Sequence, residues 1–145
     1  FGNNVEPRCV PSRLDRIIEG ALELAETTIL GKKIGVVRKF ANPEISVDPA
    51  MMQRALLNLI LNGVQAMPQG GTLTIEGDAE EIRIQDTGPG IPSGIIEKLF
   101  TPLVTSKSKG TGLGLAIARK NIELHGGTVE AANHPDGGAV FVIRL

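Results

Sequence analysis

Apolar and polar residues alternate along the chain with two periods, one typical of helices and the other of strands. After Ser12, apolar residues recur every three or four positions, which predicts an amphipathic helix that has Ser12 as its N-cap. The members of this apolar face are Leu14, Ile18, Ala21, Leu22, Ala25 and Ile29. A second helix is predicted from Pro49 to about Met67, because Asp48 is a favourable N-cap and proline suits the first helical position. Further helical patterns cover residues 94–100 and 113–125.

Strand patterns fill the intervals between the predicted helices. They cover residues 33–40, 44–48, 71–77, 80–86, 126–133 and 137–145. Short links with Gly, Asp or Pro join the third strand to the fourth and the fifth to the sixth, which predicts two hairpins. The fold class is therefore α+β. We expect a two-layer α/β sandwich whose mixed, mostly antiparallel sheet is covered on one face by helices.

Composition narrows the range of functions. The 145 residues are enough for a core, and we expect a single domain over residues 1–145. A hydrophobic content of 41% and apolar runs far shorter than a membrane span are typical of a globular chain. A net charge of −1 and the lack of Trp and Tyr argue against nucleic-acid binding. The single cysteine, Cys9, excludes an internal disulfide and suits a reducing compartment.

The helix predicted after Asp48 carries a narrow polar stripe in an otherwise apolar sequence. Arg54, Asn58, Asn62 and Gln65 follow one another at intervals of four, four and three residues, so they share one face of the helix. The stripe contains no carboxylate, and carboxamides offer oxygen ligands to a hard cation and hydrogen bonds to phosphate. It therefore indicates a lined cavity, with a thin exposed strip of Asn and Gln as the structural alternative.

A strand that ends in a carboxylate and breaks into glycines follows. In "IRIQDTGPGIP", Asp86 closes the strand, and Gly88 and Gly90 let the backbone approach a ligand or adopt positive φ. Such a carboxylate can accept a hydrogen bond from an amino group like that of adenine. The alternative is an Asx turn, in which Asp86 bonds the amides that follow it.

Three alternating glycines open the last predicted helix. Gly110, Gly112 and Gly114 leave backbone N–H groups free to face a phosphate, which the helix dipole also favours. Lys107 and Lys109 lie just before them and add positive charge. The spacing matches neither the Walker pattern nor the dinucleotide fingerprint, so a flexible connector is the alternative interpretation.

Taken in order, these segments are similar to the ATP-binding domain of sensor histidine kinases, within the superfamily of gyrase, heat-shock chaperone, histidine kinase and mismatch-repair ATPases. "LLNLILNGVQAM" resembles the asparagine box of the family, "DTGPGIP" its first glycine box, and "KLFTPLVTSKSKGTGLGLAIARKNIELHGG" its phenylalanine box, lid and second glycine box. The resemblance extends over nearly the whole chain. It implies the Bergerat-type ATP-binding fold and a kinase that uses ATP and Mg²⁺.

The resemblance also implies roles for individual residues. Asn62 matches the magnesium-binding asparagine, and Asn58, one turn earlier, is expected to support metal or phosphate binding; these two are the expected catalytic residues. Asp86 matches the aspartate that holds the adenine amino group. The full ATP-binding set that the resemblance implies is Asn58, Asn62, Gln65, Asp86, Gly88, Gly90, Ile91, Lys107, Lys109, Gly110, Thr111, Gly112, Leu113, Gly114 and Leu115.

One position bears on whether the phosphoryl group goes to a histidine or to water. Hydrolytic members of the superfamily carry, four residues before the metal-binding asparagine, a glutamate that serves as general base for water. This chain has Asn58 there, which takes no proton at neutral pH, whereas a neutral histidine attacks phosphorus without a base. The sequence therefore favours transfer to a histidine over hydrolysis of ATP.

The acceptor histidine is expected outside this chain. The two histidines, His125 and His134, lie at a predicted helix end and in a predicted turn, so we expect a histidine-bearing dimerisation domain of the same protein before Phe1. The resemblance further implies a response regulator receiver domain as partner, a monomeric isolated domain, and a cytoplasmic location, with membrane anchoring of the sensor left open. Two other functions stay open: an anti-sigma-factor type serine kinase and a non-catalytic nucleotide-binding signalling module.

Overall fold

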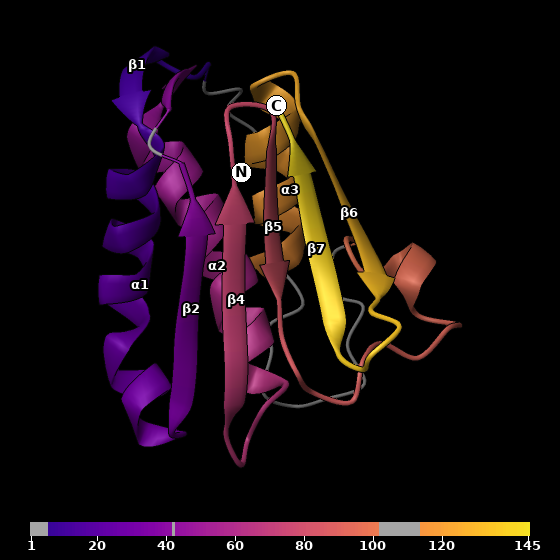
Figure 1. Cartoon of the computed structure of the whole chain (residues 1–145). Coiled ribbons are helices and arrows are strands. Elements are labelled where there is room, and N and C mark those ends of the chain that lie inside the picture. The colour runs from indigo at the N-terminus through magenta and orange to yellow at the C-terminus, as the bar shows by residue number, and fades with distance from the viewer. Residues whose placement is uncertain (1–5, 42, 102–113) are drawn as a thin grey trace.

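A layer of helices covers one face of a five-stranded sheet in the computed structural model, which describes residues 6–41, 43–101 and 114–145 (Figure 1). The strand order is β2–β4–β5–β7–β6. These strands are β2 (Ile34–Phe40), β4 (Gly71–Gly77), β5 (Glu81–Gln85), β6 (Thr128–Asn133) and β7 (Ala139–Arg144). Helix α2 (Pro49–Gln65) packs between α1 (Leu14–Gly31) and α3 (Gly114–Leu124). The predicted two-layer α/β sandwich is confirmed.

The sheet is mixed, as predicted, with one parallel pair. β2 runs parallel to β4, whereas β4–β5, β5–β7 and β7–β6 are antiparallel pairs. The two predicted hairpins correspond to β4–β5 and β6–β7. Alternation along each strand places the apolar residues against the helices, where they form a buried core. Its largest fully buried side chains include Leu14, Ile18, Met52, Leu56, Leu59, Ile60, Leu73, Ile75, Ile82, Ile84, Ile122 and Phe141.

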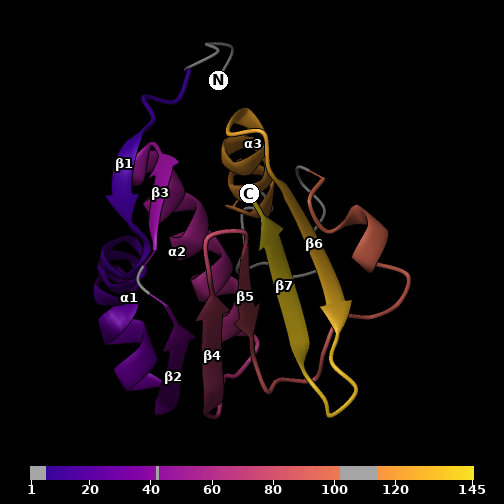
Figure 2. The ribbon, with the colours of Figure 1, turned by 45° about the horizontal axis from the view of Figure 1, so that its top comes forward.

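A second, two-stranded sheet lies apart from the first and was not expected. β1 (Val10–Arg13) pairs with β3 (Glu44–Val47), and Figure 2 shows the two strands side by side. This pairing makes the prediction of Ser12 as N-cap wrong. Ser12 lies opposite Ile45 in the ladder and its hydroxyl donates to the carbonyl of Val10 at 2.8 Å, so α1 begins one residue after Arg13 without a side-chain cap.

Asp48 caps α2 as predicted. Its side chain accepts a hydrogen bond from the backbone N–H of Met51 at 3.1 Å, and Pro49 occupies the first turn. The helix predicted over 94–100 is shorter than expected, because only Ile96–Lys98 form a 3₁₀ turn, η1. A segment so short gains too few backbone hydrogen bonds to extend into an α-helix without packing along its length.

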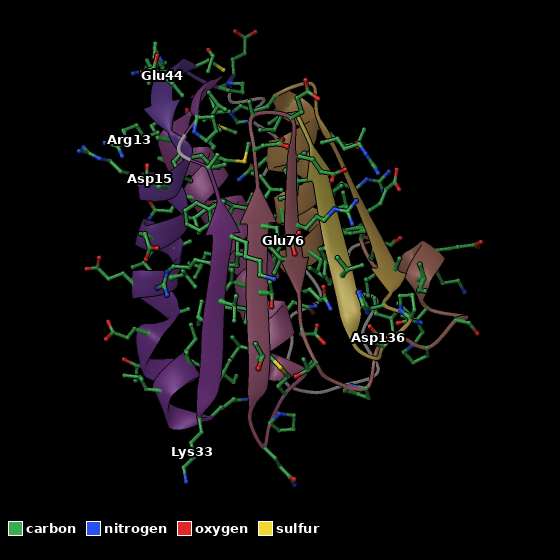
Figure 3. The ribbon with its side chains drawn as sticks, viewed as in Figure 1. Arg13, Asp15, Lys33, Glu44, Glu76 and Asp136 are labelled. Carbon is green, nitrogen blue, oxygen red and sulfur yellow. The ribbon has the colours of Figure 1, made fainter. Side chains whose placement is uncertain are left out.

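The outer face of the sheet is mostly polar. Lys39, Glu76 and Arg83 lie opposite one another on β2, β4 and β5, and Figure 3 shows Glu76 on the side of the sheet away from the helices. The residues predicted to form the site lie away from this face. In Figure 1 the C-terminal end of α2, the end of β5, the turn between β6 and β7 and the start of α3 all point toward the lower half of the view. In the described residues, no helix is both long and apolar enough to cross a membrane.

Candidate functional site

Asp86 follows directly on β5 and is the one buried polar or charged residue of the described core, with 2% of its surface exposed. Its Oδ1 accepts hydrogen bonds from the backbone N–H of Gly88 at 2.9 Å and of Ala139 at 3.2 Å. Its own N–H donates to the carbonyl of Ala139 at 3.0 Å. One carboxylate oxygen thus forms the Asx turn considered in the sequence analysis and also anchors the loop to β7.

The second oxygen, Oδ2, stays available. Among the described residues no donor bonds it, and no fully buried side-chain oxygen or nitrogen there lacks a partner. Oδ2 is therefore the oxygen of this nearly buried carboxylate that no described residue bonds. A carboxylate oxygen that is held in place and has no donor among its described neighbours is a fixed acceptor for an amino group of a ligand.

Two glycines let α2 approach the loop that contains Asp86. A Cβ added to Gly63 of α2 would lie 3.1 Å from Leu73 Cδ1 and 3.7 Å from Asp86 Cβ. A Cβ added to Gly88 would lie only 2.6 Å from the carbonyl oxygen of Ala66. At both positions a larger side chain would crowd its neighbours, so the two glycines allow the helix and the loop to pack directly against each other.

The far end of the loop is held by the hairpin of β6 and β7. The side chain of Asn133, the last residue of β6, makes two hydrogen bonds with the backbone of Ile91. Gly138, near the start of β7, has φ of +85° and packs against the carbonyl of Asp86, where a Cβ would collide with the oxygen. Gly63, Asn133 and Gly138 are not predictable as site residues from the sequence, because each acts through a contact with a residue distant in the sequence.

The carboxamide stripe of α2 lies at the same end of the molecule. Asn58 and Asn62 are half-buried and Gln65 is exposed. In the part of the chain that the structure describes, the side chains of these three residues make no hydrogen bond. Gly114, the first residue of α3, faces Asn58: its Cβ position lies 3.8 Å from Asn58 Cγ. The sequence motifs on α2 and α3 are therefore brought into contact.

Not every predicted residue can be placed. Lys107, Lys109, Gly110, Thr111, Gly112 and Leu113 lie outside the described residues. Leu115 is half-buried and packs against the core from α3, and Ile91 does so from the loop. Phe100, from the predicted phenylalanine box, contacts the buried ring of Phe141 edge-on, with ring centroids 6.0 Å apart.

The donor set at this end suits a cation only in combination with a ligand. No cluster of three or more His, Cys, Asp or Glu side chains that could hold a metal ion occurs in residues 6–41, 43–101 and 114–145. Carboxamide oxygens of Asn58 and Asn62 are neutral, and Mg²⁺ normally takes substrate phosphates and waters among its ligands. The residues present therefore fit Mg²⁺ carried by a phosphate-bearing ligand better than a free, protein-only metal centre.

Helices α2 and α3 are also connected at the ends that lie away from the candidate site, the start of α2 and the end of α3. His125 follows α3, and its Nε2 accepts a hydrogen bond from the backbone N–H of Asp48 at 3.0 Å. Because Nε2 accepts, the ring hydrogen lies on Nδ1, which donates to the carbonyl of Asn121 at 2.7 Å. The predicted placement of His125 at a helix end is confirmed, and its ring connects α3 to the start of α2.

The backbone around Asp48 stabilises its charge. Hydrogen bonds from the N–H groups of Arg8 and then Met51 lower the pKa of the Asp48 carboxyl group. Arg8 precedes β1, so this one carboxylate connects the N-terminal strand to α2.

The sequence profile of a known family, described as Histidine kinase-, DNA gyrase B-, and HSP90-like ATPase, matches residues 47–145. The chain belongs to this ATPase family. The matched segment includes the carboxamide stripe, the Asp86 loop and α3, which are the elements that meet at the candidate site. As a member of this family, the domain binds ATP.

Relatives narrow the type of ATPase domain. The sensor histidine kinase ZraS of Escherichia coli strain K12 is 32% identical over an alignment of 162 positions, gaps included. This alignment covers 92% of this chain and 35% of ZraS. The sensory histidine kinase/phosphatase NtrB of Escherichia coli O157:H7 is 34% identical over an alignment of 153 positions, gaps included. This alignment covers 90% of this chain and 44% of NtrB. The chain therefore spans about a third to under half of the length of these relatives.

Solved structures of the family have the same fold. The catalytic domain of the histidine kinase ThkA matches with a TM-score of 0.81 and 29% identity, over 95% of both chains. Full-length ShkA in complex with AMPPNP matches with a TM-score of 0.80 and 26% identity, over 97% of this chain and 31% of ShkA. ThkA in complex with the response regulator TrrA matches with a TM-score of 0.77 and 27% identity, over 96% of this chain and 42% of that one. Within the ATPase family, this chain is a catalytic ATP-binding domain of the sensor histidine kinase type.

Proposed function

We propose that the domain binds Mg²⁺–ATP between the Asp86 loop and the carboxamide stripe, and transfers the γ-phosphoryl group to a histidine on a separate dimerisation domain. The observation that carries the proposal is the presence, at one end of the molecule, of an available carboxylate oxygen beside α2 and of half-buried carboxamides on α2. A base with an amino group suits the first, and an anionic tail that carries a cation suits the second.

The chain's own residues have distinct tasks in this proposal. Asp86 Oδ2 accepts the hydrogen bond of the adenine amino group, and the backbone at Gly88 and Gly90 leaves room for the base. Asn62 holds Mg²⁺ through its carboxamide oxygen, and Asn58, in contact with Gly114, helps to position the phosphates. When bound, Mg²⁺ neutralises charge on the triphosphate.

The absence of a base on α2 favours transfer over hydrolysis. The helix sequence Pro49–Gln65 contains no Asp or Glu, so nothing on it can take a proton from water. A neutral imidazole nitrogen instead attacks the γ-phosphorus with its lone pair, the bond from phosphorus to the bridging oxygen breaks, and its electrons remain on ADP. Positioning and charge neutralisation then account for most of the rate enhancement.

The partners follow from the same reaction. The domain needs a histidine-bearing dimerisation domain of its own protein, and the phosphohistidine then serves a response regulator receiver domain. The complex of ThkA with the response regulator TrrA supports this expectation. We expect the isolated domain to be monomeric and to work in the cytoplasm, where ATP and Mg²⁺ are available.

Incubation of the purified chain with γ-labelled ATP, Mg²⁺ and the purified dimerisation domain of its protein tests the proposal. We expect an acid-labile label on the dimerisation domain and none on a variant of that domain whose acceptor histidine is replaced by glutamine. An acid-stable label on serine would favour the serine kinase instead. Binding of ATP with no transferred label would leave only the non-catalytic module, and release of phosphate alone would indicate an ATPase.

A further inference from the structure

Asn133 braces the glycine loop from a distant part of the chain. Its Oδ1 accepts a hydrogen bond from the backbone N–H of Ile91 at 2.6 Å, and its Nδ2 donates to the carbonyl of Ile91 at 2.8 Å. One side chain thus satisfies both polar groups of a residue 42 positions away in the sequence. Asn133 itself is exposed, so its contribution is directed at the loop and not at the core.

The backbone of the loop is shaped to receive this amide. Gly90 has φ of +86°, and a Cβ there would lie 2.8 Å from Asn133 Oδ1. A side chain at position 90 would therefore displace the amide as well as strain the backbone. The glycine and the asparagine act as a complementary pair.

The same hairpin holds the other end of the loop. Ala139 bonds both the backbone N–H and Oδ1 of Asp86, so the loop 86–91 is attached to β6 and β7 at its first and last residues. Only the short arc of Thr87, Gly88, Pro89 and Gly90 lies between these attachments. Loss of the Asn133 contacts would release one end of that arc while the core underneath stayed intact.

We propose that Asn133 is a positioning residue for the adenine pocket: its amide holds the Gly88–Ile91 segment where it can contact the base. The inference rests on the proposed binding of ATP at this loop. It assigns to the C-terminal hairpin a role in recognition of the base, in addition to its role in completing the sheet. Asn133 does not touch the reacting atoms and acts through the loop alone.

The amide is required because Ile91 presents one donor and one acceptor. Asn133→Asp keeps the shape and still accepts from the Ile91 N–H, but an ionised carboxylate has no donor for the Ile91 carbonyl and repels it. Asn133→Ala removes both bonds. Ala132→Asp is the matched control, because it adds the same charge one residue earlier on the opposite face of β6 and leaves the Ile91 contacts unchanged.

Calorimetric titration of the parent and the three variants with Mg²⁺–ATP and with Mg²⁺–tripolyphosphate tests the inference. We expect Asn133→Asp and Asn133→Ala to weaken ATP binding by about tenfold, as for loss of a hydrogen-bonded support, while Ala132→Asp binds as the parent does. Tripolyphosphate, which has no base, should bind all four proteins equally. In the transfer assay the KM for ATP should rise with kcat unchanged at saturation.

Several results would overturn the inference. Parent-like ATP affinity in both Asn133 variants would show that the brace does not position the pocket. Equal losses for ATP and tripolyphosphate, or a lower thermal midpoint with loss of both ligands, would show a general structural role. These outcomes leave the proposed function intact, because the parent still binds ATP and labels the acceptor. A parent chain that fails to bind ATP would overturn both proposals.

Discussion

The two ends of the candidate site are built differently; we name them the base end (the Asp86 loop) and the phosphate end (the carboxamide stripe of α2) after the proposed function. At the base end, Asp86 Oδ1 has two backbone donors, Ile91 is held by Asn133, and the hydroxyl of Thr87 accepts from the N–H of Thr72 at 3.0 Å. At the phosphate end, within the described part of the chain, the side chains of Asn58 and Asn62 make no hydrogen bond. The protein itself organises the first end, whereas the polar side chains of the second have no partner among the described residues and suit the ligands of the proposed function.

This difference has a physical reason. The base end consists of a strand terminus and a hairpin, whose backbone groups must find partners and so form a network among themselves. The phosphate end consists of helix side chains, and the helix backbone is already satisfied. A preorganised pocket supports affinity because little order is lost on binding. Unpaired carboxamides instead suit a hydrated, metal-bearing tail, whose waters and oxygens can satisfy them.

The largest effect is expected from a change at the phosphate end. Asn62→Ala removes the proposed metal ligand, and we expect phosphoryl transfer to fall by about 100-fold, as when one preorganised electrostatic group is lost. Rates measured across a Mg²⁺ titration should show a higher Mg²⁺ requirement. Gln69→Ala, an exposed residue beyond the end of α2, is the control. An unchanged Mg²⁺ dependence in Asn62→Ala would remove Asn62 from the metal site.

A smaller effect is expected at the base end. In Asp86→Asn the remaining carbonyl oxygen can keep both backbone bonds, so the loop stays in place. An amide NH₂ group then takes the place of Oδ2. That group would face the adenine amino group, donor against donor, and ATP affinity should fall by about tenfold. GTP presents an acceptor at the same position, so the preference for ATP over GTP should shrink. Equal affinities of the parent for ATP and GTP would contradict this role for Asp86.

The smallest effect concerns the support of the phosphate end. Asp48→Ala removes the cap of α2 and should lower the free energy of unfolding by about 1 kcal/mol. Because the bonds from Arg8 and Met51 lower the pKa of Asp48 in the folded state, its contribution is complete above the ordinary carboxyl pKa. It is lost as the pH falls through the lower folded value.

Denaturant titrations at several pH values check this prediction. The parent and Asp48→Ala should differ at pH 7 and converge in strongly acidic solution. A difference that stays constant down to low pH would mean that the charge of Asp48 contributes nothing. Loss of ATP binding in a folded Asp48→Ala protein would show that the phosphate end depends on the fixed position of α2.

Much of the architecture is encoded locally. The Asp48–Pro49 start of α2, the two hairpins and the periodicity of the buried residues depend on neighbouring residues, so they were predictable. The prediction of Ser12 as a cap was wrong because β1 and β3 pair across more than thirty residues. Local propensity at Ser12 favours a cap, but the backbone bonds of the ladder satisfy the chain differently.

The sequence by itself determined which chemical groups are present and in what order: a carboxamide stripe at helical spacing, a carboxylate at the end of a strand, and glycines at the start of α3. Only the tertiary structure decided which atoms of these groups remain free. It ties Asp86 Oδ1 to Ala139, leaves Oδ2 available, and places Asn133 on Ile91. Such contacts join residues about 40 to 50 positions apart, where no local pattern reports the pairing, because register and packing between elements set the distances.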